Sequence, residues 1–179
     1  MMESKGQLRR QLRSEALLHG MEQRKEESRR LVSLLETDEH FLQAENILLY
    51  HALSDEISLS GILSRWGSSK RLYLPRVIKD DLQVVPVTGE TDLQSGAFGI
   101  LEPQGDAIND LSVIDLVIVP GMAFDFSGRR LGRGKGYYDR LLANMPTAFR
   151  IGVCHSWQIV PEVPHEPHDI LMDKVLFPA

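Results

Sequence analysis

One segment of this chain gathers cationic side chains and glycines in a pattern that suits phosphate binding. Positions 129 to 140 hold five Lys or Arg residues, against twenty in the 179 residues of the whole chain. Glycines and cations alternate within it, in the order Gly132, Arg133, Gly134, Lys135, Gly136. Glycine permits positive φ angles and close approach of a ligand, and successive backbone N–H groups then form an anion-binding concavity. The pattern predicts a polyphosphate-binding loop; a solvated basic loop is the alternative.

Two common phosphate motifs are excluded by their spacing. A Walker A loop requires Ser or Thr after Gly-Lys, but Gly136 follows Lys135, and the earlier glycine that it requires is Arg129. A dinucleotide-binding fingerprint that began at Gly132 would require glycine at the position of Tyr137. The segment therefore predicts neither a P-loop nucleotidase nor a nicotinamide-binding enzyme.

Two aromatic residues and a carboxylate follow the loop directly. Tyr137 and Tyr138 offer a surface on which a flat ligand can stack, and Asp139 offers oxygen ligands to a metal ion. Aromatic residues at helical spacing usually pack in the core, so one of the two tyrosines is expected there instead.

The elements around this segment predict an α/β fold. Runs rich in Ile, Val, Leu and Tyr predict strands at 47–53, 71–77, 113–119 and 150–154. Helices are predicted in the first third of the chain, after a cap at Ser58, and over 136–144. Strands separated by helices predict a single domain over residues 1–179, α/β and Rossmann-like, with a mostly parallel central sheet flanked by helices. The basic segment then lies at the carboxyl edge of that sheet, where open α/β sheets bind ligands.

The remaining stretches carry weaker signals. Leu8, Leu12 and Ala16 recur at helical spacing, so the first helix is expected to turn this stripe to the core and its basic residues to solvent. Turn-forming residues crowd positions 80–109, which predicts irregular structure or a short hairpin. Positions 173–177 are expected to form an edge strand.

Composition narrows the classes of function. The net charge of -5 argues against general nucleic-acid binding, which relies on basic residues to bind the phosphate backbone. The single cysteine, Cys154, excludes a disulfide framework and a cysteine-rich zinc site. The N-terminus has no apolar core of the kind that a secretory signal needs, and the longest apolar run, 116–124, is shorter than the roughly 20 residues that span a bilayer. A cytoplasmic monomer without membrane or nucleic-acid partners is expected.

The chain resembles the 5-formyltetrahydrofolate cyclo-ligase family, also called 5,10-methenyltetrahydrofolate synthetases. The resemblance is carried by Pro-Gly-Met-Ala-Phe-Asp at 120–125 and by Gly-Arg-Arg-Leu-Gly-Arg-Gly-Lys-Gly-Tyr-Tyr-Asp-Arg-Leu-Leu at 128–142. Shorter similarities follow the family's order at Lys5, Arg9, Tyr50, Glu56-Ile57, Pro75-Arg76, Phe98 to Pro103, Gln158, Pro164, His168-Asp169 and Asp173. The chain departs from the family at His155-Ser156-Trp157, where many members have an aromatic residue and an acid, and positions 78–94 carry no match.

The resemblance implies that the protein uses ATP and Mg²⁺ to cyclise 5-formyltetrahydrofolate to 5,10-methenyltetrahydrofolate, releasing ADP and phosphate through a phosphorylated formyl intermediate. It implies catalytic roles for Arg133 and Lys135 at the γ-phosphate. The implied ATP contacts are Lys5, Arg9, Gly132, Arg133, Gly134, Lys135, Gly136, Tyr137 and Asp139. The implied folate contacts are Glu56, Tyr137 and Tyr138, and the implied metal ligands are Asp139 and Asp169. No histidine is assigned a role.

Two other classes of function stay open on the residues alone. A nucleic-acid-binding module could use the Arg/Gly loop, although 7% aromatic residues and an acidic balance argue against it. A sugar-phosphate or CoA-ester enzyme could use a similar scaffold, but it would need a carboxylate nucleophile or base in the glycine loop, which here is cationic.

Overall fold

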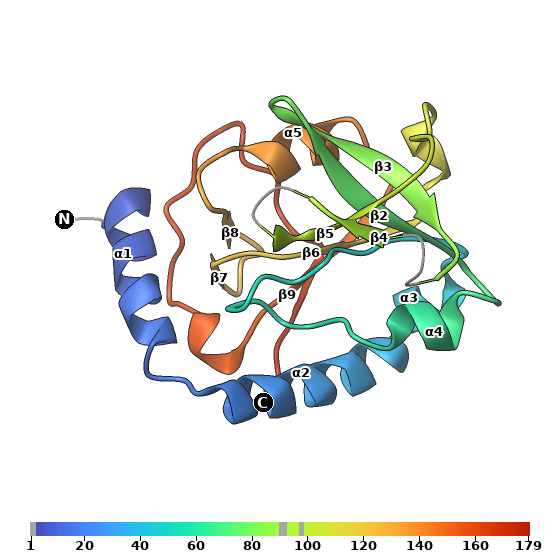
Figure 1. The fold of residues 1–179 in the computed structure, drawn as a ribbon. Coiled ribbons are helices and arrows are strands. Elements are labelled where there is room, and N and C mark those ends of the chain that lie inside the picture. Colours follow the sequence, from blue (N-terminus) through green and yellow to red (C-terminus); the bar gives the residue numbers. More distant parts are fainter. Residues whose placement is uncertain (1–2, 90–92, 97–98) are drawn as a thin grey trace.

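The computed structural model describes residues 3–89, 93–96 and 99–179, and a six-stranded sheet lies at its centre (Figure 1). The sheet order is β10-β9-β6-β1-β2-β3. The strands are β1 (Asn46–Leu48), β2 (Arg71–Ile78), β3 (Asp81–Val87), β6 (Leu116–Val119), β9 (Phe149–Val153) and β10 (Lys174–Leu176). Neighbours pair in parallel except β2 and β3, which form an antiparallel hairpin. The predicted α/β fold with a mostly parallel sheet is confirmed.

The chain changes its direction of travel across the sheet at β1. It passes from β1 through α4 (Ile62–Trp66) to β2 on one side, and after β3 it crosses to β6 on the other side. Leu48 in β1 is in register with Tyr73 in β2 and with Val117 in β6, so the three strands run to the same edge. Such a switch point is where open α/β sheets bind ligands.

Helices cover both faces of the sheet. On one face pack α2 (Met21–Glu36), which runs along the bottom of Figure 1, and α3 (Glu39–Gln43), through buried residues such as Leu31 and Phe41. On the other face packs α5 (Tyr137–Ala143), through Leu141 and Leu142. All four residues of β6 are fully buried as a result, which is why its sequence is continuously apolar rather than alternating.

The first helix, α1 (Lys5–Ala16), packs on a cluster of its own. The stripe predicted for it is buried, and Leu8 and Leu12 meet the hairpin of β7 (Ala123–Phe124) and β8 (Arg130–Leu131). The same stripe leaves the polar face of α1 beside the glycine loop that follows β8. Capping by Ser4, whose Oγ accepts from the backbone N of Gln7 at 3.2 Å, fixes where the helix begins.

Two local predictions are wrong. Ser58 caps no helix, because α4 begins only after Gly61, whose φ is +89°; the Ser58 Oγ accepts from the backbone N of Ser60 instead. The stretch 80–109 contains the seven-residue strand β3 in addition to the predicted short hairpin, β4 (Leu93–Ser95) with β5 (Leu101–Pro103). The prediction rested on turn-forming residues, but β3 pairs with β2 along its whole length at the sheet edge, where Pro86 is tolerated.

Other boundaries shift by local chemistry. The strand predicted at 113–119 begins at Leu116, since Leu111–Val113 form a 3₁₀ turn capped by Asp110. The edge strand predicted at 173–177 is β10. Arg24 of α2 is held against a neighbouring segment, because its Nη1 donates to the carbonyl of Ser54 at 2.9 Å. None of the helices in the described ranges is long and apolar enough to cross a membrane.

Candidate active site

A cavity of about 760 Å³ opens where the parallel strands end. Its walls include Tyr50 after β1, Pro75 in β2, and Pro120 and Gly121 after β6. The cavity is lined by all of the residues that the sequence predicted for ATP, folate and metal: Lys5, Arg9, Glu56, Gly132, Arg133, Gly134, Lys135, Gly136, Tyr137, Tyr138, Asp139 and Asp169. The fold therefore brings together side chains from both ends of the chain and from its middle.

The glycine loop is fastened to α1. Gly134 and Gly136 have φ angles of +109° and +70°, a region that residues with a Cβ rarely adopt. The Nε of Arg9 donates to the carbonyl of Gly132 at 2.8 Å. A Cβ at position 134 would lie 3.6 Å from the Cζ of Arg9, so the guanidinium also packs against the loop. Arg9 thus holds the loop as well as lining the cavity.

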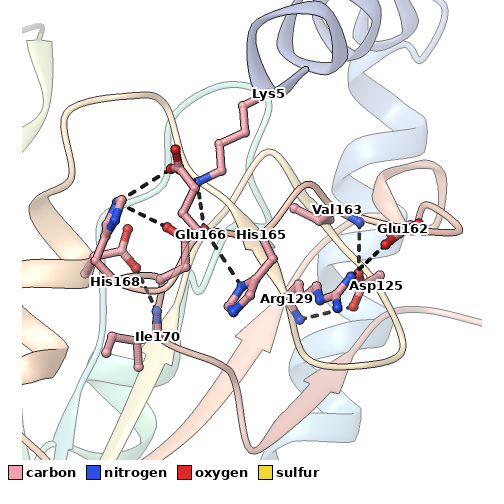
Figure 2. A network of polar contacts seen from close by, with 11 residues as sticks. Lys5, Asp125, Arg129, Glu162, Val163, His165, Glu166, His168 and Ile170 are labelled. Atoms are coloured by element: carbon pink, nitrogen blue, oxygen red, sulfur yellow. Dashed lines mark hydrogen bonds and ion pairs between the residues drawn. The ribbon is translucent and has the colours of Figure 1, made fainter. Parts of the chain in front are cut away.

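A buried carboxylate shapes the approach to this loop. Asp125, 2% exposed, closes the Pro-Gly-Met-Ala-Phe-Asp segment. Its Oδ1 accepts from the backbone N of Ser127 at 2.9 Å. Oδ1 also accepts from the N of Arg129 at 3.1 Å, and Oδ2 accepts from the N of Val163 at 2.9 Å (Figure 2). These bonds form the turn between β7 and β8, so Asp125 is structural.

Arg133 lies between two carboxylates of the segment that follows β1. Its Nη2 is 2.5 Å from Oδ1 of Asp55 and 3.1 Å from Oε1 of Glu56, and its Nε is 3.3 Å from the same Oε1. The other oxygen of Glu56 accepts from the backbone N of Leu53 at 2.9 Å. Burial raises the pKa of Glu56, although the Leu53 bond and the Arg133 charge lower it. The residue expected to bind folate and a residue expected to bind phosphate are therefore in direct contact.

Lys5, on the polar face of α1, lies between two carboxylates of the C-terminal segment. Its Nζ is 2.7 Å from Oε2 of Glu166 and 2.7 Å from Oδ2 of Asp169 (Figure 2). Burial would lower the pKa of Lys5, but the hydrogen bonds that it donates to these two carboxylates leave it raised. Burial likewise opposes ionisation of Asp169, but the bonds from Lys5 and from the backbone N of Glu166 leave its pKa lowered. Asp169 is therefore ionised at neutral pH.

The carboxylates at this end of the cavity suit a divalent cation. Asp139 accepts from the backbone N of Ile170 at 3.1 Å, which places it beside the segment that carries Asp169. Glu166, His168 and Asp169 offer ligand atoms within 4.8 Å of one another. Mg²⁺ prefers oxygen ligands and usually binds one or two carboxylates besides phosphates and waters. Asp139 and Asp169 offer the oxygen ligands that this metal prefers, although in this structure the Asp169 carboxylate is paired with Lys5.

The two tyrosines differ in their surroundings. Tyr138 packs against the core cluster that contains α5, as predicted for one of the pair, and burial raises the pKa of its hydroxyl. The Cζ of Arg140 lies 5.6 Å from the centre of the Tyr137 ring. Arg140 also donates to the carbonyl of Lys135 at 2.9 Å and to that of Asp80, so it ties the glycine loop to the β2–β3 turn.

Sequence reasoning missed Arg130. Its guanidinium lines the cavity, donates from Nη1 to the carbonyl of Pro120 at 3.0 Å and stacks 5.4 Å from the Tyr138 ring centre. Its Nε is buried and has no hydrogen-bond partner among the described residues, and burial lowers its pKa. Arg130 belongs to the basic segment 129–140, so the high density of cations there already indicated it.

An apolar wall was also missed. It is formed by Pro75, Val77, Leu82, Ile100 and Leu101, of which Leu82 comes from the strand β3 that was not predicted. Phe98, which belongs to the similarity at 98–103, lies outside the described residues. The wall adds apolar surface to a cavity that is also lined by charged residues and glycines, and no short sequence motif predicts it.

The segment that departs from the family lies behind the cavity wall. His155 is fully buried, and its Nδ1 is 2.8 Å from Oε2 of Glu27 on α2. Burial lowers the pKa of His155, although the contact with Glu27 raises it. The ring of Trp157 stacks on that of His155 with centroids 5.6 Å apart. Neither residue lines the cavity.

Comparisons with known proteins agree with one another. The family model described as the 5-formyltetrahydrofolate cyclo-ligase family matches residues 1–178. The Haemophilus influenzae protein named 5-formyltetrahydrofolate cyclo-ligase is 34% identical over 142 residues, which cover 75% of this chain and 76% of that protein. The Escherichia coli K12 protein of the same name is 28% identical over 88% of this chain and 91% of its own. The NMR structure of Aquifex aeolicus 5,10-methenyltetrahydrofolate synthetase has a TM-score of 0.85 and 33% identity, covering 96% of this chain and 88% of that one.

Proposed function

Because the chain belongs to the 5-formyltetrahydrofolate cyclo-ligase family, we propose that it cyclises 5-formyltetrahydrofolate to 5,10-methenyltetrahydrofolate at the expense of ATP, with Mg²⁺ as the metal. The proposal keeps the expected monomer in the cytoplasm, with a small molecule as substrate and neither nucleic acid nor membrane as partner.

One observation carries the proposal: a single cavity is lined by the cationic glycine loop, by a set of apolar side chains and by Glu56. The loop suits a triphosphate, since its backbone N–H groups and side-chain cations face anions. The apolar wall suits a flat ring system. A carboxylate accepts two hydrogen bonds from the guanidine-like edge of a pterin, which supports Glu56 as the folate contact.

The reaction explains why a phosphate site and a folate site must adjoin. A formamide oxygen is a poor leaving group, so in the proposed sequence it first attacks the γ-phosphorus of ATP, and the bond from phosphorus to the bridging oxygen breaks to release ADP. N10 then attacks the formyl carbon, the carbon–oxygen bond breaks with its electron pair leaving on phosphate, and N10 loses its proton. Positioning and charge neutralisation dominate the catalysis of phosphoryl transfer.

The side chains of the loop match these demands. Lys135 is exposed at the cavity and forms no ion pair within the described residues, so its ammonium is available to the γ-phosphate. Arg133 would neutralise the same group, and Lys5 and Arg9 would reach the phosphates from α1. Gly132 to Gly136 would bring their N–H groups close, and Tyr137 and Tyr138 would contact the rings of the substrates.

Asp139 and Asp169 would hold the magnesium ion of the nucleotide. Bound there, the ion would neutralise phosphate charge. Arg130 lines the cavity and has an Nε with no hydrogen-bond partner among the described residues, so it would add a further cation for the phosphates.

A spectrophotometric assay tests the proposal. The purified protein is mixed with 5-formyltetrahydrofolate and Mg-ATP, and the absorbance of the conjugated methenyl product is followed. The expected result is product that appears only when ATP and Mg²⁺ are both present. Absence of product with a protein that still binds Mg-ATP would reject the folate as acceptor, and product without ATP would reject the phosphorylated intermediate.

A further inference from the structure

In this structure the proposed folate contact is already occupied. Both oxygens of Glu56 accept hydrogen bonds, Oε1 from Arg133 and Oε2 from the backbone N of Leu53, and the side chain is only 8% exposed. A pterin edge that takes both oxygens therefore requires the Arg133 guanidinium to leave Oε1.

The two cations of the glycine loop are in different states. Lys135 is exposed and forms no ion pair with a described residue, so a phosphate meets it without competition. Arg133 is paired with two carboxylates, at 2.5 Å to Asp55 and 3.1 Å to Glu56. A phosphate that recruits Arg133 must therefore compete with both.

Asp55 is the member of this triad that touches neither proposed substrate site. It does not line the cavity, whereas Glu56 and Arg133 do. Its segment is anchored from the core side, because Gln158 donates from Nε2 to the Asp55 carbonyl at 3.4 Å and Arg24 donates to the carbonyl of Ser54 at 2.9 Å. Asp55 thus stays in place when Arg133 moves, and it acts on ligands only through that arginine.

We propose that Asp55 is a positioning residue that holds Arg133 on Glu56 while the cavity is empty, and that it thereby couples the binding of the two substrates. The inference rests on the function proposed above. Mg-ATP draws Arg133 to its phosphates and frees Glu56 for the folate, while the folate, by taking Glu56, frees Arg133 for the phosphates. The substrate that binds first must supply the free energy that moves Arg133 off Glu56. The second substrate binds without that penalty.

The coupling has a definite form. In its closed position Arg133 is paired with Asp55 and Glu56, and in its open position it has left Glu56. L is the ratio of the closed to the open population in the protein without ligands. If both ligands bind only the open form, the apparent Kd of each ligand alone is raised by the factor 1 + L. The same factor must apply to both ligands, because linkage is reciprocal. Removing the Asp55 charge lowers L, so it tightens the binding of each ligand alone and leaves the affinities in the ternary complex unchanged. Damage to the fold would weaken binding instead.

Isothermal titration calorimetry provides the test. The Kd of a non-hydrolysable ATP analogue with Mg²⁺ and the Kd of 5-formyltetrahydrofolate are measured alone and at saturation of the other, in the wild type and in Asp55→Asn. Glu162→Gln is the matched control, since it breaks the 2.9 Å ion pair of Glu162 with Arg129, and neither residue lines the cavity (Figure 2).

In the wild type we expect both Kd values to fall by the same factor, on the order of fivefold or more, when the other ligand is present. In Asp55→Asn the Kd values for single ligands should fall toward the ternary values and the factor should approach one, while Glu162→Gln behaves as the wild type does. Wild-type ligands that bind independently, or an Asp55→Asn protein with unchanged coupling, would overturn the inference; if the methenyl product still forms, the proposed function survives. A wild type that neither binds the folate nor forms product overturns both.

Discussion

The ammonium nitrogen of Lys5 lies 2.7 Å from Oδ2 of Asp169, although 164 positions separate the two residues in the chain. One of them is proposed to bind ATP phosphates and the other to bind magnesium, so in this structure the cation and the anion of the nucleotide site neutralise each other. The same holds for Arg133 with Asp55 and Glu56. Mg-ATP carries both signs of charge and can replace both partners of the Lys5–Asp169 pair at once.

Replacing Lys5 with methionine should therefore weaken the use of ATP. A hydrogen bond to a charged group contributes about 1.5–3 kcal/mol, which corresponds to a rise in the KM for Mg-ATP of roughly 10- to 100-fold. Initial rates at varied ATP measure the effect. Arg10→Met on the exposed side of the same helix is the control and should keep the wild-type KM. Equal KM values for Lys5→Met and the wild type would remove Lys5 from the nucleotide site.

Glu56→Gln should raise the stability of the fold at high pH while it weakens the use of the folate. Burial raises the pKa of Glu56, so its contribution to stability is fully present below the unfolded value near 4.5 and is lost as the pH rises through the folded value. The variant should therefore melt above the wild type at pH 8, by a margin that shrinks toward pH 4.5, while its KM for the folate rises about tenfold or more. Thermal melts across this pH range and folate titrations check both expectations. A variant that melts below the wild type at pH 8 would contradict the first.

His155 should make the folded state sensitive to mild acid. Burial lowers its pKa, so its contribution is present above the unfolded value of 6.5 and is lost as the pH falls toward the folded value. The free energy of unfolding should fall between pH 7.5 and pH 5.5, and the fall should be smaller in His155→Gln. Urea titrations at several pH values measure the slopes. His168→Gln, at a side chain that is 70% exposed, serves as the comparison and should retain the wild-type slope; equal slopes in all three proteins would exclude His155 as the cause.

Gly152→Ala should destabilise the packing of β9 in the sheet. A Cβ at position 152 would lie 2.4 Å from Cε1 of Phe124 and 3.0 Å from Cγ of Met172. Such overpacking of a core typically costs about 1–3 kcal/mol in the free energy of unfolding. Gly89→Ala, where a Cβ meets nothing within 4 Å, should be neutral. Urea titrations measure the free energy of unfolding of both variants. If Gly152→Ala is as stable as the wild type, the Phe124 ring moves aside without cost and the prediction is wrong.

Local chemistry explains which parts of the site could be predicted. The glycine loop is a run of consecutive residues, so its sequence alone indicates its function. The spacing of Leu8, Leu12 and Ala16 shows which face of α1 is buried, so Lys5 and Arg9 could be assigned to the polar face. The strand β3 was missed because turn-forming residues crowd positions 80–109, whereas the strand forms through its pairing with β2 at the sheet edge.

Long-range partners could not be predicted in the same way. Nothing near Arg133 in the sequence indicates that Asp55, 78 positions earlier, is its partner. Part of the apolar wall has the same origin: Val77 and Leu82 pair across the local β2–β3 hairpin, but Ile100 joins them only when a later segment folds against the same cavity. Such contacts join residues that are far apart in the sequence, so only the folded chain shows that they are neighbours.

The one cysteine of the chain has a practical consequence. Cys154 follows β9, is fully buried, and has a thiol whose pKa burial raises. Because the thiolate is the reactive form, the native protein should withstand oxidants and alkylating reagents without a protecting reductant. A cysteine introduced at Arg10 or Arg13, on the exposed side of α1, would then be the single reactive thiol. A fluorophore attached there could report ligand binding beside α1, with the native cysteine left in place.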